Sequence, residues 1–313
     1  MSQLVTISHG YYKPYFYWMF PILVAREERL FEKEGINLSV HDIVSEGQPE
    51  DKANWYKGAF ENRSRDFYFC CAWQGIYSTC ETGRGKIGAA LRSTLIKTFA
   101  IYTNPDSDLA NVLDLVDQQV PIAVNLNADA HYVTLKNLSE FVPSERVKLL
   151  HLGGVEKCFK ALVGREVKAA TLAGPYAEAA EALGYRRLLS LSRTEPTVVV
   201  FNEVLGTDVL RSFVGAINAA IARINADRRR YRARYVKEFE EVVAEYMPEI
   251  KGSLPLITPK MRLPAWAPAT ALSREEFSEI HSFLLEQGLS EPGKGYDVTV
   301  GADVSASAPN PLG

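Results

Sequence analysis

The sequence predicts an α/β protein built from two lobes. Its opening reads as a strand at residues 4–8, a helix that ends at Gly35, and a second strand at residues 36–40. Strand, helix and strand in this order form the opening βαβ unit of an α/β domain. A second run of alternating strands and helices begins with the apolar segment 120–124. At 313 residues, the chain is long enough for two such lobes.

Lobe 1 is predicted to consist of two separate segments of the chain and lobe 2 of one. Residues 1–102 and 197–289 are expected to form lobe 1, and residues 103–196 lobe 2. Two crossing strands, at 97–102 and 197–202, are expected to connect them, with a ligand cleft between the lobes, since ligands of open α/β sheets bind at the carboxyl ends of strands. From residue 290 the sequence turns to Gly, Ser, Ala and Pro, which predicts a flexible tail over 290–313.

Composition and charge argue against several classes of partner and bear on the location of the protein. A net charge of −3 gives no electrostatic reason to expect nucleic acid as a partner. The one basic run, at residues 228–234, is interpreted as a solvated helix face. The four cysteines lack metal-site spacing, and we expect no metal and no cofactor. With no segment that predicts membrane insertion and no export signal before the first strand, a cytoplasmic location is expected, or a periplasmic one if the chain is a mature fragment.

Residues 30–36, Leu-Phe-Glu-Lys-Glu-Gly-Ile, form the end of the first predicted helix and the first residue of the second strand. This segment resembles a signature of the type II periplasmic-binding-protein fold, in the branch that holds sulfonate-binding proteins of ABC transporters and thiamine-pyrimidine synthases. The resemblance implies a two-lobed protein that captures a small organic acid, an aromatic carboxylate or sulfonate. A permease partner is implied only if the protein is exported. The cysteine-rich iron motif of the synthases has no counterpart here.

Loops at four strand ends, together with the segment 174–176 after a fifth strand, supply the candidate ligand-binding residues. The loops offer aromatic rings, amides, hydroxyls and a helix N-terminus, which suit an acid with a planar body. Two of these features also have a plainer interpretation, in which the rings belong to the core and Asn127 is only a helix cap, a role that suits its residue type. The candidate ligand-binding residues are Tyr11, Tyr12, Tyr15, Trp73, Gln74, Ser93, Thr94, Asn125, Asn127, Ala128, Gly174 and Tyr176.

An enzyme on the same scaffold is the alternative. Aryl sulfinate desulfinases and some decarboxylases are similar to binding proteins, and a lyase of this type needs a proton donor and a cation for the acid group. The candidate catalytic residues are His9, Cys71, Arg92 and His131. The desulfinases carry a cysteine at the first strand-end loop, and His9 stands near that place. This departure counts against desulfination and leaves decarboxylation open.

Overall fold

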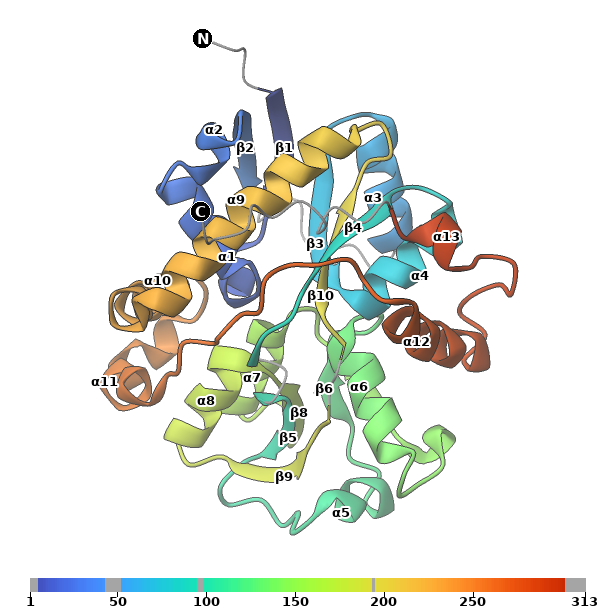
Figure 1. Ribbon diagram of the computed structural model, residues 1–313. Helices are drawn as coiled ribbons and strands as arrows, with labels where there is room; N and C mark the ends of the chain where they lie inside the picture. The colour runs from blue at the N-terminus through green and yellow to red at the C-terminus, as the bar shows by residue number, and fades with distance from the viewer. Residues whose placement is uncertain (1–4, 43–51, 95–97, 193–194, 302–313) are drawn as a thin grey trace. The chain divides into compact units, whose positions relative to one another are not determined.

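A computed structural model of the protein describes residues 5–42, 52–94, 98–192 and 195–301 (Figure 1). The chain folds into two compact units, each with its own sheet. Unit 1 contains Met1–Ser93, Glu195–Asp227 and Trp266–Gly313, whereas unit 2 contains Thr94–Thr194 and Arg228–Ala265. The chain therefore passes between the units four times, and each unit is discontinuous in sequence.

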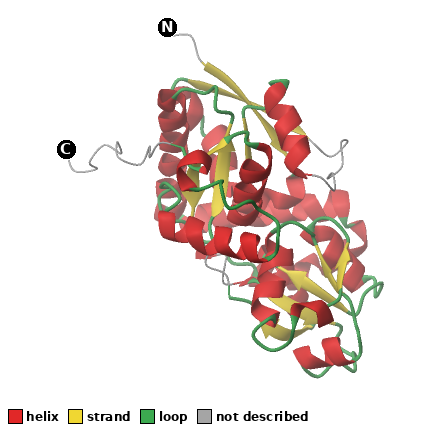
Figure 2. Cartoon of the chain, turned by 90° about the vertical axis from the view of Figure 1, so that its right-hand side faces the viewer, coloured by secondary structure: helices red, strands yellow, loops and turns green. Residues whose placement is uncertain are grey.

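Unit 1 has five described strands and helices on both faces of its sheet (Figure 2). Its elements in chain order are β1 (Val5–Tyr11), η1 (Lys13–Tyr15), α1 (Phe16–Glu27), α2 (Leu30–Lys33), β2 (Ile36–Asp42), α3 (Lys52–Glu61), β3 (Phe67–Cys71), α4 (Ala72–Thr82), β4 (Lys86–Leu91), β10 (Thr197–Phe201), α9 (Thr207–Ala226), α12 (Arg274–Glu286) and α13 (Tyr296–Thr299).

The sheet of unit 1 has the strand order β2-β1-β3-β10-β4. Strands β1, β2 and β3 are parallel, while β10 runs antiparallel to β3 and β4. Every residue of β10 is buried, as expected for a run of β-branched residues in the middle of a sheet. Four of the five strands, β1 to β4, therefore end at the same edge.

Each face of this sheet is covered by helices that contact alternate residues of β10. Phe213 of α9 packs against Phe67 of β3 and Phe201 of β10, with ring centroids 4.6 and 5.1 Å apart. On the opposite face, Gly75 of α4 lies so close to Val198 that a Cβ there would stand 2.6 Å from its methyl group. Alternation along the strand thus divides the core of unit 1 into two layers.

Unit 2 also has five described strands, in the order β7-β6-β8-β5-β9. Strand β6 is parallel to β7 and β8, and β5 is antiparallel to β8 and β9. Its elements in chain order are β5 (Ala100–Thr103), α5 (Val112–Asp117), β6 (Ile122–Val124), α6 (Asp129–Leu138), η4 (Ser144–Arg146), β7 (Leu149–His151), α7 (Val155–Val163), β8 (Ala169–Leu172), α8 (Gly174–Ala182), β9 (Arg186–Ser190), α10 (Arg228–Tyr246), η5 (Pro248–Ser253), α11 (Leu254–Ile257) and η6 (Thr258–Lys260).

The units divide the chain differently from the predicted lobes. Strand β5, expected in lobe 1, pairs with β8 and β9 of unit 2. Helix α10, also expected in lobe 1, packs on unit 2, where the ring of Phe239 lies 6.0 Å from that of Tyr176 in α8. The segment expected to return between the lobes at 197–202 is instead the internal strand β10 of unit 1. Residue 97, where the first crossing strand was expected to begin, lies outside the described residues.

Much of the predicted tail is packed against unit 1. Thr299 of α13 is fully buried, and its Oγ1 lies 3.4 Å from Sγ of Cys80. Val300 is also buried and forms a parallel bridge with Ile87. The expectation of a flexible tail is wrong for residues 290–301, because two side chains enter the core; residues 302–313 lie outside the described part. No helix within the described residues has the length and apolar character needed to cross a bilayer.

Candidate functional site

The carboxyl ends of β1, β3 and β4 bring the first group of candidate residues to one edge of unit 1. Tyr11 is the last residue of β1, and Cys71 the last of β3. Arg92 directly follows β4. Because parallel strands end at a common edge, the structure brings these three segments together within unit 1.

His9 lies inside β1 and not in a loop. The strand extends to Tyr11, so His9 pairs with both Val40 and Phe67. Its side chain is buried, and its ring stacks on that of Phe67 at a centroid distance of 4.4 Å. The first strand therefore extends three residues beyond its predicted end at residue 8, and the loop that follows it begins after Tyr11.

The tyrosines that end or follow β1 remain half-buried. The rings of Tyr12 and Tyr15 meet edge to face, with centroids 5.3 Å apart. Tyr15 makes a second edge-on contact with Tyr17, which is buried in α1. One side of this tyrosine group is thus fixed by the core, while Tyr11, Tyr12 and Tyr15 each keep some accessible surface.

The segment after β3 is the first turn of α4. Cys71 is the N-cap, and its Sγ accepts a hydrogen bond from the backbone N–H of Gln74 at 3.4 Å. Trp73 is fully buried and packs edge-on against Phe283 of α12. Gln74 is also buried, and no described residue accepts a hydrogen bond from its Nε2. The structure thus gives Cys71 a capping role and places Trp73 in the core.

Arg92 is held in place by groups of unit 1. Its Nε and Nη2 donate to the two carboxylate oxygens of Glu276, at 2.7 and 2.5 Å. Its Nη1 donates to Oγ1 of Thr270, and Nη2 also donates to the carbonyl of Ala271. Glu276 belongs to the capping box of α12 as well, where it accepts from the backbone N–H of Ser273. This bidentate pair supplies the anionic partner that the sequence analysis expected from a ligand.

Ser93 and Thr94 continue from Arg92 into unit 2. Ser93 forms an antiparallel bridge with Trp266. Thr94 is exposed; its backbone N–H donates to the carbonyl of Ala265, and its side-chain Oγ1 accepts from the N–H of Ala265. Both residues therefore stand where the chain passes between the units.

In unit 2, the loop after β6 is organised by two histidines. The backbone N–H of Leu126 donates to Nδ1 of His151, and that of Asn127 donates to Nδ1 of His131, each at 3.1 Å. Asn127 has a positive φ of 56°, and the helix N-cap is Ala128, which is buried. Asn125 is buried as well.

These hydrogen bonds fix the chemistry of the loop. Nδ1 can accept a backbone N–H only when it carries no proton, so both imidazoles bear their proton on Nε2 when neutral. Burial lowers the pKa of His131 to about 4. In addition, Oδ1 of Asp129 accepts the N–H of Ala130 in the first helical turn. The loop thus offers imidazole and amide groups, and an acid bound at this helix start would meet the Asp129 carboxylate.

The segment after β8 begins α8. The N–H of Gly174 donates to Oγ1 of Thr98 at 2.8 Å. Tyr176 is fully buried, with its ring between those of Phe159 and Phe239. Gly174 is thus tied to Thr98 at the start of α8, and Tyr176 belongs to the core of unit 2.

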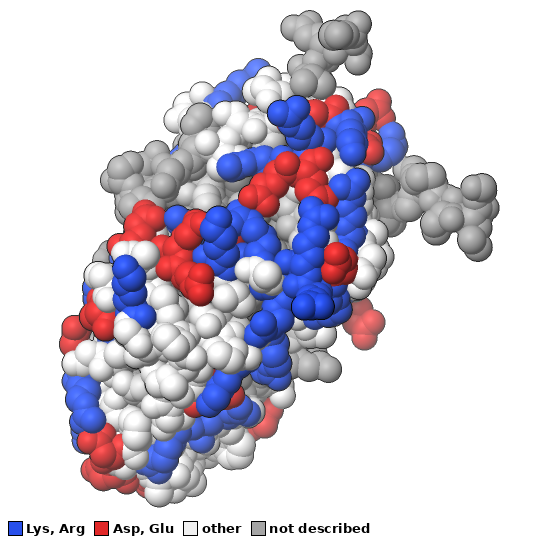
Figure 3. Space-filling view, turned by 90° about the vertical axis from the view of Figure 1, so that its left-hand side faces the viewer, with Lys and Arg blue, Asp and Glu red and all other residues white. Residues whose placement is uncertain are grey.

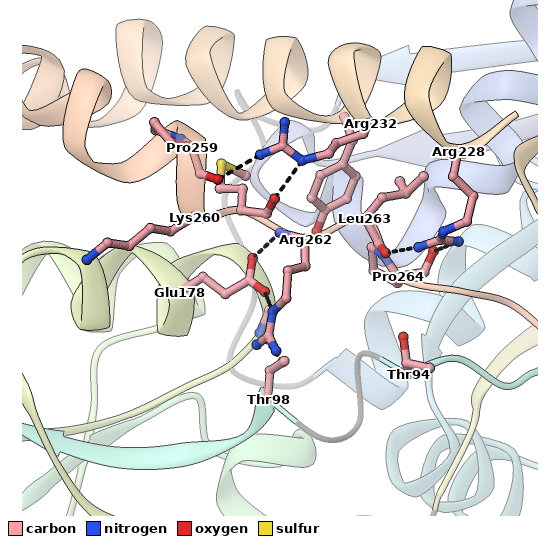
Figure 4. Close-up of a pocket in the computed structure, with 13 residues that line it drawn as sticks. Thr94, Thr98, Glu178, Arg228, Arg232, Pro259, Lys260, Arg262, Leu263 and Pro264 are labelled. Carbon is pink, nitrogen blue, oxygen red and sulfur yellow. Dashed lines mark hydrogen bonds and ion pairs between the residues drawn. The ribbon is translucent and has the colours of Figure 1, made fainter.

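A cavity of about 720 Å³ lies within unit 2 beside Gly174 (Figure 4). Thr94 and Gly174 are the candidate residues that line it. The rest of its wall comes from α8, α10 and the segment that leads to Ala265, and includes Thr98, Glu178, Arg228, Arg232, Tyr235 and residues 259–264.

Several residues of these sites were missed by the sequence analysis. His151 ends a strand, so the strand-end rule could have found it. The pairing of Glu276 with Ser273 was visible as a Ser-x-x-Glu capping box. Arg228 and Arg232 are spaced four residues apart on one helix face, but the run that contains them was interpreted as solvated.

Comparison with solved structures identifies the fold. The chain matches the alkanesulfonate-binding protein of Xanthomonas axonopodis pv. citri, bound to MOPS, with a TM-score of 0.67 over 93% of this chain and 96% of that one. It also matches the periplasmic aliphatic sulphonate-binding protein of Escherichia coli, with a TM-score of 0.64 over 94% and 90% of the two chains. The fold is that of the periplasmic binding proteins.

A third matched structure comes from another bacterium. It is the ligand-binding component of an ABC-type import system from Staphylococcus aureus, solved with zinc bound, with a TM-score of 0.65 over 95% of this chain and 96% of that one. Sequence identities to the three structures are 15%, 14% and 13%, so the likeness is one of fold. No protein-family profile matches the chain, and no curated protein matches it.

Proposed function

We propose that the protein is a binding protein for a small organic acid, an aromatic carboxylate or sulfonate. The observation that carries the proposal is the group of half-buried tyrosines at the carboxyl end of β1, formed by Tyr11, Tyr12 and Tyr15. Tyrosine rings give a flat contact area and a hydroxyl for hydrogen bonding, which suits an aromatic acid. The fold supports the proposal, because two of the matched structures are named as sulfonate-binding proteins.

The names of the matched structures also support proposals about a partner protein and about the cellular compartment. One matched protein is named as part of an ABC-type import system and another as periplasmic. They support a membrane permease as partner and favour the periplasm over the cytoplasmic location expected from the sequence. Radiolabelled ligand uptake in cells with and without the gene would test the permease partnership.

No described residue favours the lyase alternative. His9 is buried inside β1 against Phe67, and Arg92 is neutralised by Glu276. Cys71 caps α4. Binding without chemical conversion is therefore the function we propose.

The first test is native mass spectrometry of the protein with a panel of aromatic carboxylates, sulfonates and sulfinates. We expect one acid to be retained intact. Tyr12→Ala should then weaken binding by about tenfold, the loss of roughly 1.4 kcal/mol of aromatic contact. Tyr185→Ala is the matched control, because Tyr185 is also half-buried but precedes β9 at the opposite end of a strand. Retention of no acid, or equal affinity in the Tyr12 variant, would contradict the proposal.

A further inference from the structure

Gln74 carries a buried polar group that has no partner in the described chain. The residue is 6% exposed, and its side-chain Nε2 meets no hydrogen-bond acceptor among the described residues. A buried donor without an acceptor destabilises a protein, so native structures keep few of them. An oxygen atom of a bound ligand would satisfy this donor.

The neighbouring side chains in the first turn of α4 are accounted for within unit 1. The Sγ of Cys71 caps the helix, and Trp73 belongs to the core. Gly75 lies against Val198 of β10. Gln74 is therefore the residue of this turn whose polar end is left for another molecule.

The start of α4 is electrostatically suited to an anion. The N-terminal end of a helix carries roughly half a positive charge, which acidic side chains in the first turn commonly offset. The first turn of α4 contains no acidic residue, and its cap is the thiol of Cys71, which is a weak acceptor. Helix α12, by contrast, has Glu275 and Glu276 in its first turn. The positive end of α4 is therefore not offset by a side chain of its own first turn.

The start of α6 in unit 2 is less suitable for an acid group. Its first turn contains Asp129, whose Oδ1 accepts the N–H of Ala130. The Nδ1 of His131 is also an acceptor, because it receives the N–H of Asn127. A carboxylate of the protein thus already lies at the start of α6 and would repel an acid, whereas α4 offers a donor.

Gln74 lies at the same edge of the sheet as the tyrosine group. Strands β1 and β3 are parallel neighbours that pair through His9 and Phe67. Strand β1 ends at Tyr11, and β3 ends at Cys71, three residues before Gln74. Neighbouring strands lie about 4.8 Å apart, so one small aromatic acid is long enough to span the two strand ends.

The cavity of unit 2 is the other position to consider, because three arginines line it. Arg228 and Arg232, assigned from the sequence to a solvated helix face, instead donate to backbone carbonyl groups (Figure 4). Arg262 pairs with Glu178. The three guanidinium groups are thus turned to separate partners. Other basic side chains gather on the face shown in Figure 3, where carboxylates lie beside many of them.

We propose that the acid group of the ligand binds at the start of α4 and accepts a hydrogen bond from Nε2 of Gln74. The inference rests on the function proposed above, because it assigns the acid-binding position of that same site. A helix dipole and a neutral amide suit a singly charged group, so the carboxylate or sulfonate binds here while Tyr11, Tyr12 and Tyr15 contact the aromatic body.

The stability of the ligand-free protein is the first test. Gln74→Leu removes the unsatisfied amide and keeps a side chain of similar size, so the melting temperature should stay within about 1 °C or rise. Asn137→Leu is the matched control. Asn137 is also a buried amide, but its Nδ2 donates to the carbonyls of Val133 and Ser192, and its Oδ1 accepts the N–H of Ser192.

Asn137→Leu should therefore lower the melting temperature by about 2 °C or more. An equal loss in Gln74→Leu would overturn the inference, since the Gln74 amide would then have a partner within the protein.

Binding is the second test, and it uses the acid retained in the mass-spectrometric panel and the primary amide of that acid. The two ligands share one ring and differ in charge, and isothermal titration calorimetry gives the ratio of their affinities. Gln74→Leu should weaken binding of the acid by about tenfold or more, because a hydrogen bond to a charged group is lost. Gln74→Glu should lower the ratio further, because its carboxylate repels the acid and accepts from the amide. Tyr12→Ala should weaken both ligands by a similar factor.

Asp129→Asn tests the competing position at α6. It should change the affinity for the acid by less than about twofold. A gain of about tenfold would place the acid at α6 and overturn the inference. So would an unchanged ratio of affinities in both Gln74 variants, which would leave the proposed function intact. Retention of no acid from the panel would instead refute the proposed function, and this inference with it.

Discussion

The protonation state of His131 affects the stability of the folded protein. Its Nδ1 accepts the N–H of Asn127, and burial lowers its pKa from 6.5 to about 4. The unfolded chain therefore binds more protons than the folded chain between these two values. Stability should fall as the pH decreases from 6.5 to 4, and be independent of this residue above 6.5.

Denaturant unfolding at several pH values between 7 and 4 measures this effect. We expect His131 to contribute a loss on the order of 1–3 kcal/mol in the free energy of unfolding, reduced by its partial exposure. His131→Asn keeps an acceptor near the position of Nδ1 and removes the titration. A variant that loses stability with acid as steeply as the wild-type protein would refute this role for His131.

Gly75 is a second residue whose type matters for stability, because the space between α4 and β10 at this position holds a hydrogen atom but no methyl group. A Cβ would stand 2.6 Å from Cγ2 of Val198 and 3.4 Å from Sγ of Cys70. Gly75→Ala should lower the free energy of unfolding by about 1–2 kcal/mol, because overpacking outweighs the better helix propensity of alanine.

Gly58 in α3 provides the matched control for Gly75. A Cβ at Gly58 meets nothing within 4 Å. Gly58→Ala should therefore stabilise the protein by about 0.5–1 kcal/mol through helix propensity alone. Thermal unfolding of both variants decides the matter: a shift of the two melting temperatures in the same direction would contradict the close packing of α4 on β10.

At the scale of elements, α13 shows how a short helix can complete a core. The segment after α12 returns to unit 1, where Val300 pairs with Ile87 of β4. Val300 is buried, whereas Val298, two residues earlier, is 54% exposed. The two valines thus differ in environment but not in chemistry.

Val300→Ala should lower the free energy of unfolding by about 1–2 kcal/mol, the value of two buried methyl groups lost without repacking. Val298→Ala should change it by less than about 0.5 kcal/mol. Urea denaturation of the two variants gives both numbers. Equal stability in the two variants would mean that α13 does not contribute to the core of unit 1.

The sequence predicted elements better than it predicted their partners. The strands predicted at residues 4–8, 36–40 and 120–124 correspond to β1, β2 and β6 to within a few residues, because the pattern of apolar residues that marks a strand is local. The location of β10 between β3 and β4 could not be inferred, since nothing in Thr197–Phe201 distinguishes an internal strand from a crossing strand. The same limit applies to α10, which follows α9 in sequence but packs on the other unit.

Among the candidate residues, residue type indicated location poorly. Trp73 and Tyr176 were chosen as aromatic residues at strand ends, yet both rings are fully buried. Arg92 was chosen as a cation, and Glu276, 184 positions away, is its partner. Which side of a ring faces the core, and which acid lies beside a cation, are tertiary facts that local patterns do not contain.

On the scale of the whole molecule, both units are assembled from separate stretches of chain. The sheet of unit 1 takes β10 from a stretch that follows β4 by about a hundred residues, whereas the five described strands of unit 2 all lie in the one stretch Thr94–Thr194. Among the described strands of unit 1, β10 lies between β3 and β4 and begins at Thr197. In unit 2, β5 is made first and lies between β8 and β9.

This strand order has a consequence during synthesis on the ribosome. About a hundred residues separate β4 from β10, so at 5–20 residues per second roughly 5–20 s pass between their emergence. Throughout this time, β3 and β4 lack the strand that later forms hydrogen bonds with the backbone groups of their facing edges. Strand β5 of unit 2 is likewise made before β8 and β9, the two strands with which it pairs. Unpaired strand edges are the surfaces through which nascent chains aggregate. The strand order of unit 1 therefore lengthens the time during which the new chain exposes unpaired edges, beyond what its length alone would require.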